Sequence, residues 1–146
     1  MKSLNNERDR REIRERIESL EPSCKPLWGR MNATEMLAHC SAQLRMSWGE
    51  IECKPKQSPL GRLPLKQALV YFAPWPKGAP TAPELIRADA ENWVVETAKL
   101  FDLIERFPAE IEFTSVPHPI FGTLSKRAWG RLGYRHLDHH LRQFGV

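Results

Sequence analysis

Cysteine is scarce in this sequence, and its few cysteines are not spaced for a disulfide framework or an all-cysteine zinc site. The 146 residues include only Cys24, Cys40 and Cys53, an odd number without a Cys-x-x-Cys pair. Disulfide scaffolds need even sets of cysteines, and cysteine-based zinc sites need closely spaced pairs. We therefore expect reduced thiols, as in a cytoplasmic protein.

Long hydrophobic runs and a strong charge of one sign are also missing. No apolar stretch approaches the roughly 18 residues that a membrane span needs, and the charged N-terminal residues do not resemble a secretory signal. The 22 basic and 18 acidic residues leave a net charge of only +4, and the densest charged stretch, residues 7–18, alternates in sign. Such alternation is typical of a solvated helix face rather than of a nucleic-acid surface. We expect neither a membrane nor a nucleic acid as a partner.

The composition is that of one folded domain. Hydrophobic residues make up 41% and charged residues 27% of the chain, and this length is enough to bury a core. We expect a single domain over residues 1–146, with four amphipathic helices. The expected helices are residues 5–20, ended by Pro22; residues 32–49, begun by the capping box Asn32-Ala-Thr-Glu35; residues 81–106, begun by Thr81-Ala-Pro-Glu84 and ended by Pro108; and residues 123–144, begun near Thr123 or Ser125.

Proline is concentrated between the second and third expected helices. Six of the 12 prolines lie in residues 52–80, which predicts a long connection that is functional or runs over the other helices. Residues 63–72 could form a short helix in it, with Pro64 tolerated in the first turn. Residues 110–123 are expected to be irregular, with a short strand left open as an alternative. The predicted fold is all-α, a four-helix bundle with a long proline-rich connection between helices 2 and 3.

Two of the five histidines share the apolar face of the last expected helix. At 100° per residue, His136 and His140 lie about 40° apart, beside Trp129 and Leu132. His139 falls at the border of that face. The opposite face collects charged residues, namely Arg131, Arg135, Asp138 and Arg142.

A histidine pair one turn apart can coordinate one metal ion, because side chains at i and i+4 are neighbours on a helix. A single buried histidine is more often bonded to a backbone carbonyl. From the helix alone both readings of His136 and His140 stay open. His39 is the natural third ligand, although it lies on the flank of the second helix's apolar arc. Cys40 points about 100° away from it and is expected in the core.

Three smaller features leave alternatives open. His118 lies between two prolines, as a rigid loop residue or at the mouth of a pocket. Gly130 and Gly133 fall inside the last helix, where glycine costs about 1 kcal/mol relative to alanine. Their presence suggests the close approach of another helix or of a ligand.

Three motifs in order resemble the DinB-like superfamily, over nearly the whole chain. The run from His136 to Gln143 resembles the His-x-x-x-His-x-x-Gln region that closes DinB-like proteins. Residues 31–39 and 118–124, followed by Trp129-Gly130, are similar to one bacterial branch of that superfamily.

This resemblance implies a four-helix bundle in which His39, His136 and His140 hold one divalent transition metal ion, zinc or nickel. It also implies frequent homodimers. Some relatives are transferases and isomerases that activate a low-molecular-weight thiol on the metal.

The first functional hypothesis is therefore a metal-dependent enzyme, a thiol S-transferase or hydrolase, which acts through a metal-activated thiol or water on a small-molecule substrate. Gln43 and Asp138 are candidates for orienting the ligands. The alternative is a bundle that binds a metal or a small ligand without catalysis. An interaction module without metal is a third possibility. A homodimer is also suggested by aromatic residues in or near loops that need cover, namely Trp28, Trp48, Tyr71 and Trp75.

Overall fold

In the computed structural model the chain is helical. The structure describes residues 1–56, 58–78, 81–86, 90–111 and 116–146, and these ranges contain no β-strand, only a single bridge between His118 and Gly122. The all-α prediction is confirmed. The α-helices of these ranges are α1 (Glu7–Glu18), α2 (Ala33–Ser47), the three-residue α3 (Leu65–Gln67), α4 (Trp93–Glu110) and α5 (Lys126–Gln143). None of the described helices combines the length and apolar character needed to cross a bilayer.

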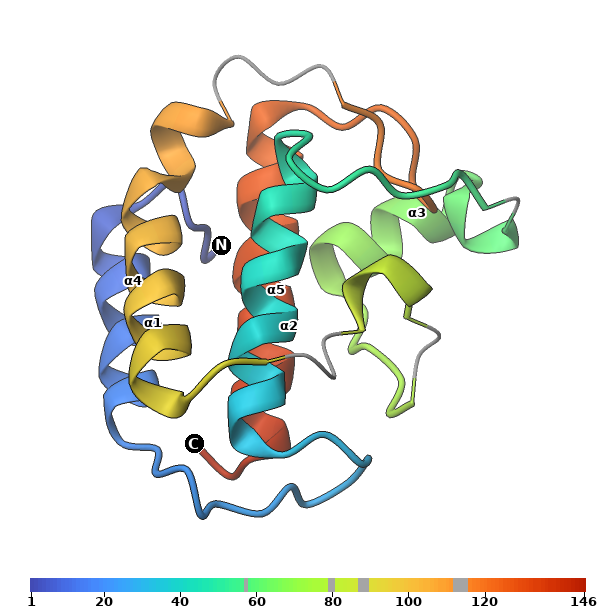
Figure 1. Cartoon of the computed structure of the whole chain (residues 1–146). Coiled ribbons are helices and arrows are strands. Elements are labelled where there is room, and N and C mark those ends of the chain that lie inside the picture. The colour runs from blue at the N-terminus through green and yellow to red at the C-terminus, as the bar shows by residue number, and fades with distance from the viewer. Residues whose placement is uncertain (57, 79–80, 87–89, 112–115) are drawn as a thin grey trace.

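The four long helices enclose one core. Helices α2 and α5 lie side by side in the middle of Figure 1; α2 also packs on α4, α5 packs on α1, and α1 meets α4. The stretch that contains α3 lies on the other side of the α2–α5 pair from α1 and α4 (Figure 1). The largest fully buried side chains come from all four long helices and the N-terminal segment, including Leu4, Ile13, Ile17, Met36, Leu37, Leu44, Leu100, Ile104, Phe107 and Trp129.

Each long helix begins at a polar residue that accepts a hydrogen bond from a backbone N–H three positions later. Asn32 and Glu35 form the predicted capping box, with both bonds at 2.9 Å. Ser125 caps α5 through the N–H of Ala128, close to the predicted start. These caps satisfy amides that the first turn of a helix leaves without partners.

The predicted limits of the third helix are wrong at both ends. Residues Pro83–Leu85 form only a 3-10 turn, and α4 begins at Trp93, where Asn92 accepts from the N–H of Val95. Pro108 lies inside the last turn of α4 instead of ending it. Because Pro108 has no N–H, the helix lacks one hydrogen bond to the carbonyl of Ile104. The burial of the neighbouring Phe107 offsets that loss.

The proline-rich connection is fastened to α5. The expected short helix at residues 63–72 appears as α3 and a π-helical turn, Ala68–Phe72. Arg131 of α5 donates to the carbonyl of Tyr71 at 2.9 Å, and Arg135 donates to that of Ala73. The connection is thus part of the packed structure. The strand considered for residues 110–123 falls mainly on residues 112–115, which lie outside the described ranges.

The aromatic residues that suggested a dimer are mostly covered within the chain. Trp48, Tyr71 and Trp75 are partly buried and pack against the core. The exposed large apolar side chains are instead scattered, among them Leu27 and Val94. The argument for a dimer from these aromatic residues is therefore weakened, and dimerisation stays a prediction.

The two glycines of α5 make room for the N-terminal segment. The N–H of Leu4 donates to the carbonyl of Gly130 at 3.0 Å. A Cβ on Gly130 would lie 2.5 Å from Asn5 Nδ2 and 2.6 Å from Ser3 Oγ, and one on Gly133 would lie 2.9 Å from Leu4 Cδ1. A close approach is confirmed, but it comes from residues 3–5, which precede α1, and not from another helix or a ligand.

We predict that Gly130→Ala lowers the free energy of unfolding, although alanine is better than glycine in a helix by about 1 kcal/mol. The added methyl group must displace Ser3 and Asn5. In a Ser3→Gly/Asn5→Gly background the same change should stabilise the protein, because the helix propensity then acts alone. Urea unfolding followed by circular dichroism measures both differences. The same sign in both backgrounds would contradict this explanation.

Candidate metal centre

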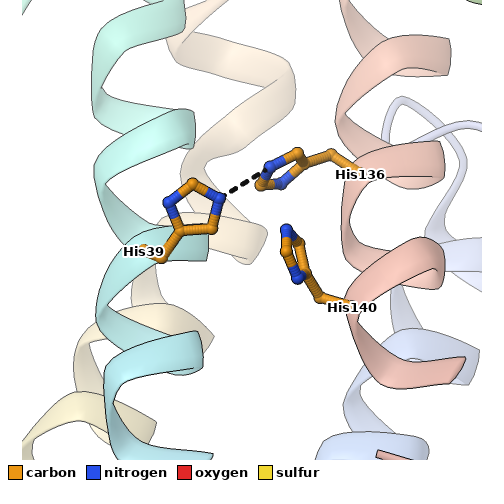
Figure 2. A group of neighbouring side chains, drawn as sticks. All are labelled: His39, His136 and His140. Atoms are coloured by element: carbon orange, nitrogen blue, oxygen red, sulfur yellow. Dashed lines mark hydrogen bonds between the residues drawn. The ribbon is translucent and has the colours of Figure 1, made fainter. Parts of the chain in front are cut away.

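Three buried histidines converge between α2 and α5 (Figure 2). His39 comes from α2, and His136 and His140 come from successive turns of α5; their exposed fractions are 2%, 7% and 8%. The ring centroids are 4.6 to 4.9 Å apart in all three pairs. One ring nitrogen of each lies within 4.8 Å of those of the other two. The structure therefore brings together all three predicted ligands, including His39, which the helical pattern alone did not place.

Two of the rings are oriented by hydrogen bonds on their outer nitrogens. His39 Nδ1 lies 2.8 Å from the carbonyl oxygen of Leu85, and His140 Nδ1 lies 2.8 Å from Gln143 Oε1. Both oxygens can only accept, so each Nδ1 carries the proton and each Nε2 keeps its lone pair. This assignment follows from the hydrogen-bond network. Such an arrangement is what ligating histidines show around a bound metal.

The orientation of Gln143 is itself fixed by its surroundings. Its Nε2 donates to the carbonyl of Trp28 at 2.6 Å, which turns Oε1 towards His140. Gly29 has φ 84°, and a Cβ there would lie 2.5 Å from Gln143 Nε2. The loop before α2 therefore closes tightly around this amide, and only glycine fits at that point.

His136 completes the group and is the least satisfied of the three. Its Nε2 lies 3.1 Å from His39 Nε2 (Figure 2), and its Nδ1 is buried with no hydrogen-bond partner among the described residues. Without an ion, His136 Nε2–H has to donate to the lone pair of His39. The 3.1 Å separation is close to the roughly 3.3 Å expected between two imidazole nitrogens that share one tetrahedral zinc ion. The distance between the two Nε2 atoms therefore fits a metal ion that both nitrogens hold.

Burial keeps these imidazoles neutral. It lowers the pKa of His39 and takes that of His140 to about 3, and the neighbouring histidines add to the effect on His140. The pKa of His136 is lowered well below the usual value, by burial first and then by His140 and His39. Since only unprotonated imidazole binds a metal, all three are ready to act as ligands at neutral pH.

His139 and Trp75 form the wall of the centre on the side of the proline-rich connection. The Trp75 ring lies 5.7 Å from that of His136 and 6.0 Å from that of His139, between centroids. His139 is only partly buried, and its ring lies 5.2 Å from that of His140. Its nitrogens are not among the converging ligand atoms, in agreement with its predicted position at the border of the apolar face.

The two residues predicted to orient the ligands do not do so. Asp138 is bound by Arg16 at 2.8 Å and Arg142 at 3.1 Å, away from the histidines. Gln43 is buried, and its Oε1 has no hydrogen-bond partner in the described part of the chain. Gln143 takes this role and could have been found from its position three residues after His140. The carbonyl of Leu85 could not, because a backbone acceptor leaves no mark in the sequence.

His118 and Cys40 have structural roles. His118 Nδ1 accepts from the backbone N–H groups of Ile120 and Phe121 at 3.1 and 3.2 Å, which agrees with a rigid loop residue. Burial lowers its pKa to about 3. Cys40 is fully buried, with its sulfur 3.7 Å from that of Met36, and belongs to the core as predicted.

Comparison with known proteins places the chain in a family. The model of a family described as a protein of unknown function (DUF1569) covers residues 2–145, and so includes all three histidines. No curated protein and no solved structure matches the chain.

We predict that the protein, purified without a histidine tag and freed of bound metal with a chelator, takes up one cobalt or nickel ion per chain. A His136→Ala/His140→Ala double variant should take up none, because a single imidazole from α2 cannot hold the ion. His139→Ala is the matched control and should keep most of the uptake. Titration with elemental analysis measures all three proteins. Equal uptake by wild type and the double variant would show that the group is an ordinary set of core histidines.

A second prediction concerns the hydrogen bond that orients His140. Gln143→Leu should weaken metal affinity by roughly 10- to 100-fold, because His140 loses the acceptor that fixes its tautomer and ring. Gln43→Leu replaces another buried glutamine, whose Oε1 has no hydrogen-bond partner among the described residues, and should leave affinity within a few-fold of wild type. Competition with a chromogenic chelator gives both constants. A greater loss of metal affinity in Gln43→Leu than in Gln143→Leu would show that Gln43 of α2, and not Gln143, orients the ligands.

Proposed function

We propose that this chain, which belongs to the DUF1569 family, is a metal-dependent enzyme that holds one divalent zinc or nickel ion through His39, His136 and His140. The observation that carries the proposal is the convergence of three buried, neutral imidazoles, two of them oriented by Leu85 and Gln143. Imidazole nitrogen suits zinc, nickel, copper or iron and does not suit magnesium or calcium.

The number of ligands favours catalysis over a purely structural role. Structural zinc sites are usually closed by four protein ligands, whereas catalytic sites use three and leave a position open. The described residues contribute three such groups to this centre. When bound, a divalent ion in such a site lowers the pKa of a thiol or water and so supplies a nucleophile. A thiol S-transferase or a hydrolase is the reaction class that this chemistry serves.

The chain's own residues would orient the ligands and exclude water. Leu85 and Gln143 hold the Nδ1 protons of His39 and His140 outwards. His136 Nδ1 has no partner in the described chain, so the proton that His136 keeps when its Nε2 acts as a ligand would lie there. Trp75 covers the ring of His136 and limits access from the proline-rich connection.

The same proposal includes a DinB-like four-helix bundle. It is supported by four long helices that pack around one core, and by histidines that come from the second and the last of them. A small-molecule thiol as substrate and a homodimer as the working assembly belong to the proposal as consequences of that resemblance.

One observation favours a second candidate. All three histidines are less than a tenth exposed, which also suits a metal- or small-ligand-binding protein in which the ion is mainly structural. The two candidates differ in whether an outside molecule can reach the ion.

Ligand exchange on the cobalt-loaded protein separates them. Azide and 2-mercaptoethanol should each shift the visible absorption bands, since an open position accepts either. Transfer of the same thiol to a chromogenic electrophile should then proceed faster than without protein and should be lost in His140→Ala. His139→Ala serves as the control that retains both signals. If neither azide nor 2-mercaptoethanol changes the spectrum, the proposal of a metal-dependent enzyme is rejected and the structural role of the ion is retained.

A further inference from the structure

A second feature of the molecule is a strongly basic pocket beside the three histidines. Its volume is about 570 Å³, and it lies between α5, the N-terminal residues, the loop before α2 and the proline-rich connection. The cations that line it are Lys2, Lys77, Arg131, Arg135 and Arg142, and among the described residues Asp138 is the only acid in its lining. The charged face of α5 that the sequence placed opposite the histidine pair is therefore partly enclosed.

Three of these cations, Lys77, Arg131 and Arg135, have no anionic partner in the part of the chain that the structure describes. Lys2 pairs with Glu12, and Arg142 pairs with Asp138 at 3.1 Å. By contrast, Arg131 and Arg135 bond only to carbonyl oxygens in the described chain.

The unused donors of these two residues are buried. The Nε atoms of both Arg131 and Arg135 are buried, and neither has a hydrogen-bond partner in the described ranges of the chain. Two guanidinium groups one helical turn apart thus retain their charge and part of their donor capacity.

Such an arrangement is unfavourable without a ligand. Like charges at i and i+4 repel each other on a helix, and burial of a charged donor without a partner costs free energy. Burial and then the charge of Arg131 lower the pKa of Arg135, which shows the same effect. An anion with several oxygens would relieve the repulsion, since guanidinium groups bind carboxylate and phosphate well.

Aromatic side chains form much of the remaining wall. Trp28, Phe72, Trp75 and Tyr134 line the pocket. Lys77 extends over the Trp28 ring, 4.6 Å from its centroid. A flat or apolar part of a ligand would pack on these rings. Trp75 and His139 belong both to this pocket and to the wall of the histidine centre, so the two sites are adjacent.

We infer that this pocket binds a small organic anion, whose phosphate or carboxylate group lies against Arg131 and Arg135 and whose apolar part packs on Trp28 and Trp75. The anion site stands by itself, whereas its role as the substrate site of the neighbouring centre rests on the proposed function. The rival explanation is that both arginines only fasten the connection to α5 through the carbonyls of Tyr71 and Ala73.

The test uses metal-free protein, so that no probe can bind to an ion. Phenyl phosphate and benzoate are titrated and compared with neutral benzyl alcohol, by calorimetry and by the fluorescence of the tryptophans. At least one anion should bind at least tenfold more tightly than the alcohol, and its affinity should fall with added salt. Comparison of the two anions tells phosphate from carboxylate. If neither binds more tightly than the alcohol, the inference is wrong.

Variants separate binding from fastening. Arg131→Gln and Arg135→Gln should each weaken anion binding by about tenfold or more, because a charged hydrogen bond is lost. Arg127→Gln, on the same helix but exposed and outside the pocket, is the matched control. Lys77→Gln removes a lining charge that contacts the Trp28 ring but does not bond the carbonyls of Tyr71 and Ala73, and it should also weaken anion binding. Wild-type affinity in Lys77→Gln together with loss of folding in the arginine variants would support the fastening explanation and reject the anion site.

The result is separable from that of the metal experiments. Anion binding without metal uptake would support the anion site and reject the proposal of a metal-dependent enzyme. Metal uptake with ligand exchange, but with no preference for the anions, would keep the metal centre and reject this inference.

Discussion

The burial of three imidazole rings between α2 and α5 is the constraint on which the functional half of this structure depends. Each ring has two nitrogens that need partners in a place without water. Leu85 serves His39, Gln143 serves His140, and His136 is left with the nitrogen of another histidine on one side and nothing on the other. Because burial lowers the pKa of all three, the rings stay uncharged, and one nitrogen of each turns towards the same point.

The partners of these rings determine where the loops lie. Gln143 can orient His140 only because the carbonyl of Trp28 accepts its amide and Gly29 leaves room for it. The carbonyl of Leu85 reaches His39 because the chain before α4 forms a 3-10 turn and not the first turns of a long helix. Had the third helix begun at its predicted start, this backbone oxygen would have been used inside the helix. The late start of α4 and the candidate centre are therefore linked.

The proline-rich connection joins the candidate centre to the basic pocket. Arg131 and Arg135 fasten the carbonyls of Tyr71 and Ala73 to the outer face of α5, and this fastening brings Trp75 against His136. One helix thus presents histidines to the interior and arginines to the pocket, within three turns. A molecule held by the arginines would lie beside the wall formed by Trp75 and His139.

Local patterns in the sequence determined which residues are helical near the site and which face they occupy. The capping box of α2, the start of α5 and the shared face of His136 and His140 all depend on spacing within one turn, so they were predictable. The limits of α4 were not, because Pro108 is tolerated where Phe107 is buried and Thr81 has no helix to cap. Tertiary structure alone decided that His39 meets the pair, that the carbonyl of Leu85 orients its ring, and that two arginines of the outer face line a pocket. Each of these depends on contacts between segments far apart in the chain, and a backbone carbonyl that accepts a hydrogen bond has no residue type by which it could be recognised.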